Sequence, residues 1–201
     1  MSQKSKIYNN YIKRFFDFIF AIILTVLLSP LLLLVLILVK IDEPGAKAIF
    51  KQQRCGYKGE SFTIYKFRSM YSHAPTNLAT EELPENHNYM SKLGKFIRST
   101  SLDELPQLIN IIKGEMSFIG PRPVIFEEKS LIKLRKENNI YELRPGITGY
   151  AQTYGRDTVR IKEKVYYDKY YMDNVSLILD FKLIFLTFYV VFSRKGNNDQ
   201  I

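Results

Sequence analysis

The longest hydrophobic stretch of the chain lies near its N-terminus, over residues 18–39. Of these 22 residues, 19 are apolar and none is charged. A helix of this length, at about 1.5 Å per residue, measures roughly 33 Å, enough to cross a hydrocarbon core of about 30 Å. A cleavable signal peptide fits less well, because its apolar region is usually only about 7–15 residues long. The pattern predicts a membrane segment at residues 1–40 and a second unit at residues 41–201.

Two features of this stretch bear on how it meets a membrane. Ser29-Pro30 lies near its middle, where proline removes a backbone donor, so we expect a kink or break, with the Ser29 hydroxyl free to bond a released carbonyl. Lysine and arginine residues lie on both sides of the stretch, and the positive-inside tendency keeps both flanks cytoplasmic. A re-entrant helix and a kinked single span both fit this pattern, whereas a buried core helix fits it less well.

The next segments alternate between apolar and polar residues and then lose their periodicity. Residues 49–70 contain short alternating runs punctuated by Gly56 and Gly59, which predicts a small hairpin. Residues 71–91 lack a sustained period and carry Pro75 and Pro84, so they predict a loop, either a lid or a plain surface connection.

Helical periodicity dominates the rest of the chain. Apolar residues recur every three or four positions over 102–112, which predicts a helix with one buried face that ends at Lys113-Gly114. We expect a mostly polar helix over 126–138 and another that begins near Thr158. A hydrophobic helix over 175–192 carries Asp180 and Lys182, which favours a core or membrane-interface helix over a span. The predicted fold is α+β, mainly helical with a small β-hairpin.

The composition limits the classes of molecule and metal that the protein is expected to bind. The 29 Lys and Arg against 20 Asp and Glu give a formal charge of +9, which favours nucleic acid, acidic lipid head groups or a phosphorylated substrate. With one cysteine and two histidines, a zinc site of Cys and His ligands is excluded in practice, and any metal would be held by oxygen.

The first candidate for chemistry is the adjacent carboxylate pair Asp103-Glu104. In one interpretation Ser101 and Glu104 form a capping box at the start of a helix. In the other, Asp103 is the N-cap, which places Pro106 in the first turn, where its missing donor matters little. Either arrangement places Asp103 at the positive end of a helix dipole, which suits a nucleophile or a metal ligand.

The second candidate is a set of basic residues near turn-forming glycines and prolines. These residues fit two interpretations, scattered surface cations or an anion-binding site. Arginine offers a planar fork that suits phosphate oxygens. A diphosphate substrate with Mg²⁺ would unite this set with the carboxylate pair. The set comprises Lys66, Arg68, Arg98, Arg122 and Arg144.

Several ordered motifs together resemble the bacterial sugar transferase family, the monotopic phosphoglycosyl transferases, from about Tyr11 to about Phe192. They are RFFDFIFA before the apolar run, the central Ser29-Pro30, KFRSM at 66–70, SLDELPQL at 101–108, KGEMSFIGPRP at 113–123, RPGITGYAQ at 144–152 and the late YYDKYYMDNVSLILDFKLI. The resemblance implies a monotopic protein of the bacterial inner (cytoplasmic) membrane. Its re-entrant helix would be kinked at Ser29-Pro30, beneath a cytoplasmic catalytic domain with interfacial helices.

The resemblance also implies a two-step reaction of a UDP-sugar with polyprenol (undecaprenyl) phosphate. Asp103 would attack the sugar-linked phosphate, UMP would leave, and polyprenol phosphate would take the phosphosugar, giving polyprenol-diphosphate-sugar for glycoconjugate or polysaccharide assembly. Glu104 would be the second member of the dyad, helping with Mg²⁺ or with protons, and Asp103 would also contact Mg²⁺. Residues expected at the diphosphate are Arg98, Arg122 and Arg144, with Lys66 and Asp168 as further contributors and no direct contact for Arg68.

Two departures from the family pattern stand out. Residues 71–74 read Tyr-Ser-His-Ala where many relatives carry an acidic residue. Larger relatives add an N-terminal membrane domain, so we expect a minimal, single-function form.

Three other functions compete with this one. A membrane-tethered nucleic-acid-binding protein suits the charge but leaves the Asp103-Glu104 pair unexplained, so we expect no nucleic acid partner. A glycosidase needs two carboxylates about 5–9 Å apart across a sugar ring, which neighbouring residues do not provide. A turnover assay would distinguish an enzyme from a scaffold without catalysis. The identity of the sugar is not readable from the sequence.

Overall fold

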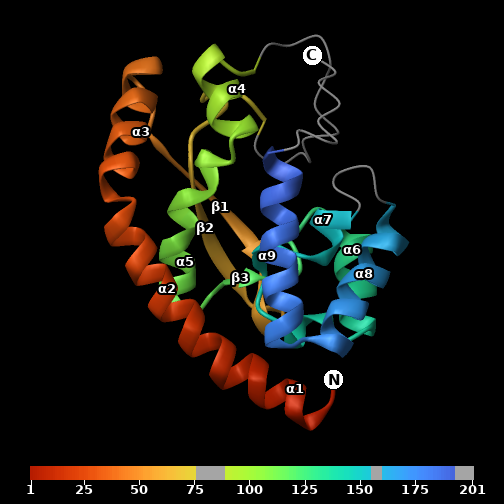
Figure 1. The fold of residues 1–201 in the computed structure, drawn as a ribbon. Coiled ribbons are helices and arrows are strands. Elements are labelled where there is room, and N and C mark those ends of the chain that lie inside the picture. The colour runs from red at the N-terminus through yellow and green to blue at the C-terminus, as the bar shows by residue number, and fades with distance from the viewer. Residues whose placement is uncertain (76–88, 155–159, 193–201) are drawn as a thin grey trace.

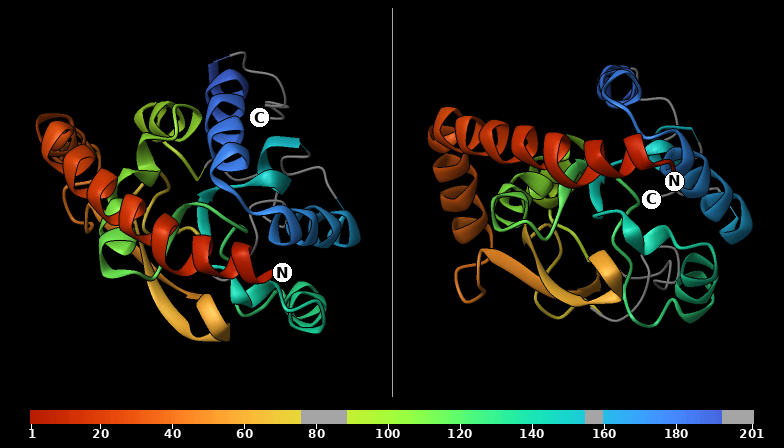
Figure 2. Two further views of the ribbon diagram at one scale, coloured as in Figure 1. Left: turned by 60° about the horizontal axis from the view of Figure 1, so that its bottom comes forward. Right: turned by 90° about the horizontal axis from the view of Figure 1, so that it is seen from below.

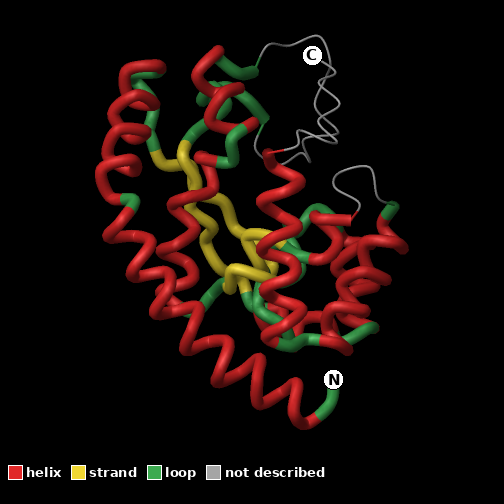
Figure 3. Tube along the Cα trace, viewed as in Figure 1, coloured by secondary structure: helices red, strands yellow, loops and turns green. Residues whose placement is uncertain are grey.

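The computed structural model describes residues 1–75, 89–154 and 160–192 (Figure 1). Helices dominate these residues, and strands form only two small pairs (Figure 3). In the right-hand view of Figure 2, the helices of residues 3–27 and the last helix, α9 (Leu177–Phe192), lie along one side of the molecule, and the hairpin of β1 (Ile49–Cys55) and β2 (Ser61–Phe67) lies along the other. The predicted fold class, mainly helical α+β with a small hairpin, is confirmed.

The N-terminal helices form a bent pair. α1 (Gln3–Ile7), the π-helix η1 (Tyr8–Ile12) and α2 (Lys13–Leu27) run without interruption, and α3 (Ser29–Asp42) follows at an angle of 65°. The Ser29 hydroxyl donates to the Val26 carbonyl at 2.8 Å. Val26 lies four residues before Pro30, so this carbonyl is the one that the proline leaves without a backbone donor. The predicted break at Ser29-Pro30 is confirmed, and the Ser29 hydroxyl replaces the backbone hydrogen bond that Pro30 lacks.

Neither arm of this pair is by itself both long and apolar enough to cross a membrane. Among the described residues, only the two arms together meet the length and hydropathy that a crossing requires. α2 and α3 also leave large apolar side chains exposed, including Val26, Leu27 and Leu33.

The predicted hairpin is confirmed as β1 (Ile49–Cys55) and β2 (Ser61–Phe67), which pair antiparallel from Ile49↔Phe67 to Cys55↔Ser61. They are joined at the 3-10 turn η2 (Tyr57–Gly59), where Lys58 and Gly59 have positive φ. Side chains alternate along β2, so Phe62, Ile64 and Lys66 share one face. Phe62 and Ile64 pack there in a core cluster with Ala21 of α2 and Ile111.

The expected helix over 102–112 is replaced by two shorter elements. α4 (Lys92–Ser99) is followed by the 3-10 helix η4 (Leu102–Gln107) and then by α5 (Leu108–Lys113). Pro106 lies inside η4 and has no backbone N–H, so the α-helical ladder starts only after it. The end at Lys113-Gly114 is as predicted, with Gly114 at φ 86°.

A second small sheet was not predicted. β3 (Ser117–Ile119) and β4 (Gly146–Thr148) pair in parallel, with Ser117 opposite Gly146 and Ile119 opposite Thr148. Strands of three residues carry no readable alternation. Their approach depends on small residues, because a Cβ at Gly146 would lie 2.1 Å from the Gly120 nitrogen.

The C-terminal helices follow the predicted order. The polar helix expected over 126–138 is α6 (Lys129–Glu137), which is followed by the 3-10 turn η5 (Ile140–Glu142), α7 (Tyr150–Tyr154) and α8 (Ile161–Asn174). Thr158, the predicted start of α8, and the loop residues 76–88 lie outside the described residues. The last helix, α9 (Leu177–Phe192), buries Asp180 and Leu183 and exposes Ile178 and Phe185, as expected for a core or interface helix.

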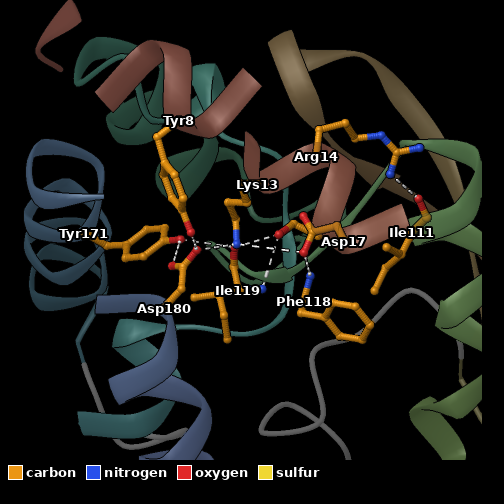
Figure 4. Close-up of polar contacts among 10 residues, drawn as sticks. Tyr8, Lys13, Arg14, Asp17, Ile111, Phe118, Ile119, Tyr171 and Asp180 are labelled. Atoms are coloured by element: carbon orange, nitrogen blue, oxygen red, sulfur yellow. Dashed lines mark hydrogen bonds and ion pairs between the residues drawn. The ribbon is translucent and has the colours of Figure 1, made fainter. Parts of the chain in front are cut away.

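A buried polar network joins α2 to α8 and α9 (Figure 4). Lys13 Nζ lies 2.7 Å from Asp180 Oδ2 and 4.0 Å from Asp17 Oδ1. The hydroxyls of Tyr8 and Tyr171 donate to the two oxygens of Asp180, at 2.8 and 2.5 Å. Because each charge has partners, the N-terminal helices are fastened to the rest of the fold by polar groups as well as by apolar packing.

Candidate active site

The carboxylate pair lies in the first turn of η4, and neither predicted cap is present. Ser101 is in the left-handed region (φ 57°) and makes no side-chain cap, whereas a capping serine needs extended backbone. The turn closes instead through the Glu104 amide, which donates to the Ser101 carbonyl at 3.1 Å. Asp103 is not an N-cap either, because Gln107 occupies that position before α5. The pair therefore sits on a tight turn whose geometry the backbone sets.

Glu104 is held by cations. Lys66, which follows Phe62 and Ile64 on the inner face of β2, places its Nζ 2.6 Å from Glu104 Oε1. Arg122 Nη1 lies 3.9 Å from the same oxygen. Burial acts to raise the pKa of Glu104, but these two cations outweigh it and hold the pKa below its usual value. Glu104 is therefore an ionised, ion-paired carboxylate.

Asp103 is in a different environment although it is the next residue. Its side chain is buried, and no hydrogen bond to its carboxylate is present among the described residues. Burial raises the pKa of Asp103 to about 6, with Lys66 acting against the rise and Glu104 adding to it. Arg98 and Arg122 also favour its charged form. A poorly solvated carboxylate without a hydrogen-bond donor is a better nucleophile than an ordinary aspartate and is still mostly ionised at neutral pH.

Two residues that contact or support the site, Gln107 and Arg135, were not predicted from the sequence. Gln107 is buried one turn after Glu104 and helps to lower the pKa of that carboxyl group. Its place three residues after Glu104 in the DELPQ segment was the available signal. Arg135 donates to the Arg122 carbonyl, and no local pattern in the sequence indicates this contact.

The predicted basic residues do not all meet at the pair. Lys66 and Arg122 contact Glu104, and Arg98 favours ionised Asp103 while its Nη1 lies 4.0 Å from Met90 Sδ. Arg68 donates to the Lys47 carbonyl at 2.7 Å.

Arg144 is occupied elsewhere. Its Nε donates to the Gly114 carbonyl at 3.0 Å, and its guanidinium lies 4.7 Å from the centre of the Tyr57 ring. Together with Arg14, which donates to the Ile111 and Ile112 carbonyls at 2.5 and 2.9 Å, it satisfies carbonyls at the end of α5. The structure thus gives Arg144 a helix-capping contact, and its expected role at the diphosphate stays a prediction.

Asp168 also lies away from the pair. It is buried on α8, where Arg135 of α6 holds its Oδ2 through Nε at 2.9 Å and Nη2 at 2.7 Å. A carboxylate that is enclosed in this way is not presented to a substrate. The expected substrate contact is therefore replaced by a buried ion pair.

The donor set of the pair fits Mg²⁺ shared with a phosphate. Among the described residues there is no group of three or more His, Cys, Asp and Glu side chains, so no complete protein cage is present. Mg²⁺ commonly takes only one or two carboxylates and completes its octahedron with phosphate oxygens and water. Because Glu104 is engaged by Lys66, Asp103 offers the freer oxygens.

Comparison with known families places this site in context. A model described as bacterial sugar transferase matches residues 8–194, nearly the whole chain and both carboxylates. The chain belongs to the bacterial sugar transferase family.

Relatives of this sugar transferase support the assignment. The sugar transferase EpsL of Bacillus subtilis (strain 168) is 38% identical over 187 residues, which cover 92% of this chain and 89% of EpsL. The undecaprenyl-phosphate galactose phosphotransferase of Salmonella typhimurium is 35% identical, with 94% of this chain and 42% of the relative covered. The UDP-glucose:undecaprenyl-phosphate glucose-1-phosphate transferase of Escherichia coli (strain K12) is 36% identical, with the same 94% and 42% covered. The chain therefore spans less than half the length of these last two relatives.

Proposed function

We propose that this sugar transferase moves a sugar phosphate from a UDP-sugar to polyprenol phosphate, giving polyprenol-diphosphate-sugar and UMP. The observation that carries the proposal is the pair of adjacent carboxylates in opposite environments: Asp103 is buried with no hydrogen-bond donor among the described residues, and Glu104 is bound by Lys66 and Arg122. Relatives named as galactose and glucose phosphate transferases to undecaprenyl phosphate support the same reaction class.

The first step is attack by an Asp103 carboxylate oxygen on the phosphorus that bears the sugar. A bond forms between this oxygen and phosphorus, and the bond from phosphorus to the bridging oxygen breaks, so UMP leaves with that oxygen. Asp103 suits this role because, with a pKa of about 6, it is both ionised and unusually basic for an aspartate at neutral pH.

The second step regenerates the enzyme. A phosphate oxygen of polyprenol phosphate attacks the phosphorus of the aspartyl-phosphosugar, and the bond to Asp103 breaks to release its carboxylate. Polyprenol-diphosphate-sugar is the product, and neither step needs an oxidant or a reductant.

The neighbouring cations bind and orient the reacting phosphates. Arg122 and Arg98 both act on Asp103 electrostatically and would offset the negative charge of the transferring group, while Lys66 keeps Glu104 ionised and fixed. Bound Mg²⁺, held through Asp103, would neutralise phosphate charge and polarise the diphosphate.

The fold supports a monotopic arrangement in the bacterial inner membrane. The bent α2–α3 pair and α9 expose apolar side chains such as Leu27, Leu33 and Ile178. A re-entrant passage through the cytoplasmic leaflet would bury these side chains and keep both basic flanks in the cytoplasm, beside the lipid-linked substrate.

The test is turnover by the nanodisc-embedded protein with Mg²⁺, polyprenol phosphate and a panel of UDP-sugars. We expect UMP release and a lipid-linked sugar with at least one donor. Asp103→Asn should abolish both, while Asp173→Asn, at an exposed aspartate paired with Lys169, should leave both unchanged. Full activity of Asp103→Asn would refute the nucleophile, and no turnover with any donor would refute the reaction.

The same panel identifies the sugar of the donor, since relatives of almost equal identity are named for galactose and for glucose. The panel should therefore include both of these donors and their N-acetylated and deoxyamino counterparts. We expect one class to be turned over at least tenfold faster than the rest, as differential contacts to one sugar would produce.

A further inference from the structure

The turn that carries Arg122 has an unusually well-held backbone. Four consecutive carbonyls, from Pro121 to Val124, each accept a hydrogen bond. The donors are the Gly146 amide at 2.9 Å, Arg135 Nη1 at 2.7 Å, Arg54 Nη1 at 3.3 Å and the Cys55 amide at 2.9 Å, in that order. The donors come from β4, α6 and β1, so three separate parts of the chain fix one short turn.

The Arg122 side chain is exposed, in contrast to the backbone of its turn. Arg122 has a side-chain exposure of 51%, and both neighbouring prolines are buried. Its Nη1 lies 3.9 Å from Glu104 Oε1, at the edge of the candidate active site. A fixed backbone with an exposed guanidinium is the arrangement expected of a pre-oriented anion-binding group.

Arg135 links this turn to Asp168. Its Nε and Nη2 bind Asp168 Oδ2, and its Nη1 donates to the Arg122 carbonyl. The side chains of Arg135 and Asp168 are 3% and 2% exposed, so neither reaches solvent or a substrate. The carboxylate orients the planar guanidinium, and the guanidinium in turn holds the carbonyl of the residue that faces Glu104.

We propose that Arg135, oriented by Asp168, is a positioning residue that sets the place of Arg122 for binding the diphosphate of the sugar nucleotide. The proposal rests on the function proposed above. Asp168 then supports catalysis through two hydrogen-bonded residues, without touching the substrate.

The alternative is a buried ion pair that only stabilises the fold. Breaking such a pair costs stability, but it does not depend on whether Arg122 has its guanidinium. A double-mutant cycle distinguishes the two, because residues that act through one another show non-additive effects.

The experiment measures UMP release and melting temperature for Arg135→Lys, Arg122→Ala and the double variant. Lysine keeps the charge beside Asp168 but lacks the fork that reaches both partners. We expect Arg135→Lys to raise KM for the UDP-sugar and to lower kcat/KM about tenfold, the loss expected for one charge-assisted hydrogen bond. In the Arg122→Ala background, Arg135→Lys should lower kcat/KM by less than about twofold, since the guanidinium that Arg135 positions is already absent.

Lys13→Arg is the matched control, because Lys13 and Asp180 form another buried ion pair, and no contact joins this pair to the Arg122 turn or to Asp103 and Glu104 among the described residues. Any loss that it causes should be the same with and without Arg122→Ala. If Arg135→Lys does not fold, Asp168→Asn, which keeps the shape of the side chain, takes its place in the cycle.

Three results would overturn the proposal. They are equal losses from Arg135→Lys in both backgrounds, full activity of Arg135→Lys, and full activity of Arg122→Ala. None of these affects the proposed reaction, which Asp103→Asn tests separately.

Discussion

At the scale of single residues, the site depends on two neighbouring carboxylates that differ in their surroundings. Lys66 lies 2.6 Å from Glu104, and the pKa of Glu104 is lowered. Burial raises the pKa of Asp103 to about 6. Pairs of acids whose pKa values are driven apart by environment are a common way to assign two different roles within one site. The proposed roles of nucleophile for Asp103 and fixed partner for Glu104 follow this pattern.

The buried charge of Asp103 should reduce the stability of the fold. A rise in pKa from 3.8 to about 6 means that the folded state prefers the protonated form. The penalty is absent below the unfolded pKa of about 4, grows as pH rises, and is complete above pH 6. At about 1.4 kcal/mol per pKa unit, it amounts to about 3 kcal/mol. Asp103→Asn should therefore raise the melting temperature by several degrees at pH 7.5 in EDTA, and by little at pH 4.

Asp173→Asn is the control for this measurement. The hydrogen bond from Lys169 lowers the pKa of Asp173, so its charge favours folding and its removal should bring no stabilisation. Equal melting temperatures for Asp103→Asn and the parent protein at pH 7.5 would contradict the buried-charge account.

At the scale of elements, the short parallel pair β3–β4 fixes the Arg122 turn. Gly120 at the end of β3 donates to the Thr148 carbonyl at 2.9 Å, and Gly146 of β4 donates to the Pro121 carbonyl. These contacts need the absence of side chains, because added Cβ atoms at Gly120 and Gly146 would lie 2.3 and 2.1 Å from the opposing backbone. Close backbone approach is thus the structural reason for two of the glycines in the GPRP and RPGITG segments.

Gly146→Ala should separate the two strands. The new methyl group has no room, and overpacking of this kind costs about 3 kcal/mol. We expect a lower melting temperature and a loss of activity, because the Arg122 turn moves with β3. Gly45→Ala, at a position with nothing within 4 Å, should change neither. Unchanged stability of Gly146→Ala would show that the strands are not as tightly paired as described.

At the scale of the whole molecule, apolar surface and buried charge are combined in the same helices. α2 and α9 expose large hydrophobic side chains and are joined to each other by the Lys13–Asp180 ion pair. A polar contact inside an otherwise apolar junction gives it a defined register, which apolar packing alone specifies less strictly. The N-terminal helices, α9 and the rest of the described fold are therefore expected to move as one body.

Cysteine labelling tests the topology that this arrangement supports. Native Cys55 is 4% exposed and is a poor target, so probes belong at exposed sites, Lys4→Cys before the bent pair and Glu60→Cys after it. In sealed inverted membrane vesicles, we expect a membrane-impermeant thiol reagent to label both. Labelling of Glu60→Cys alone would indicate that the bent pair spans the membrane, and the re-entrant proposal would fail.

Local features of the molecule were predictable because local forces decide them. A proline in the middle of a long apolar run interrupts the helical hydrogen bonds, so Pro30 starts a new helix, and alternation in residues 49–70 leads to a hairpin. The adjacent carboxylates and the lysine of the KFRSM motif were identified together, and they meet in the structure. The predicted caps at Ser101 and Asp103 failed because Pro106 delays the α-helix, which changes the backbone before it.

The sequence by itself thus determined the family, the kinked apolar segment, the hairpin and the identity of the carboxylate pair. Only the tertiary structure decided which cations serve that pair. Arg144 and Asp168 carry suitable groups, but their partners are Gly114, 30 residues away, and Arg135, 33 residues away. The Lys13–Asp180 contact spans 167 residues. Pairings at such separations depend on how whole elements pack, and no periodicity or spacing along the chain records them.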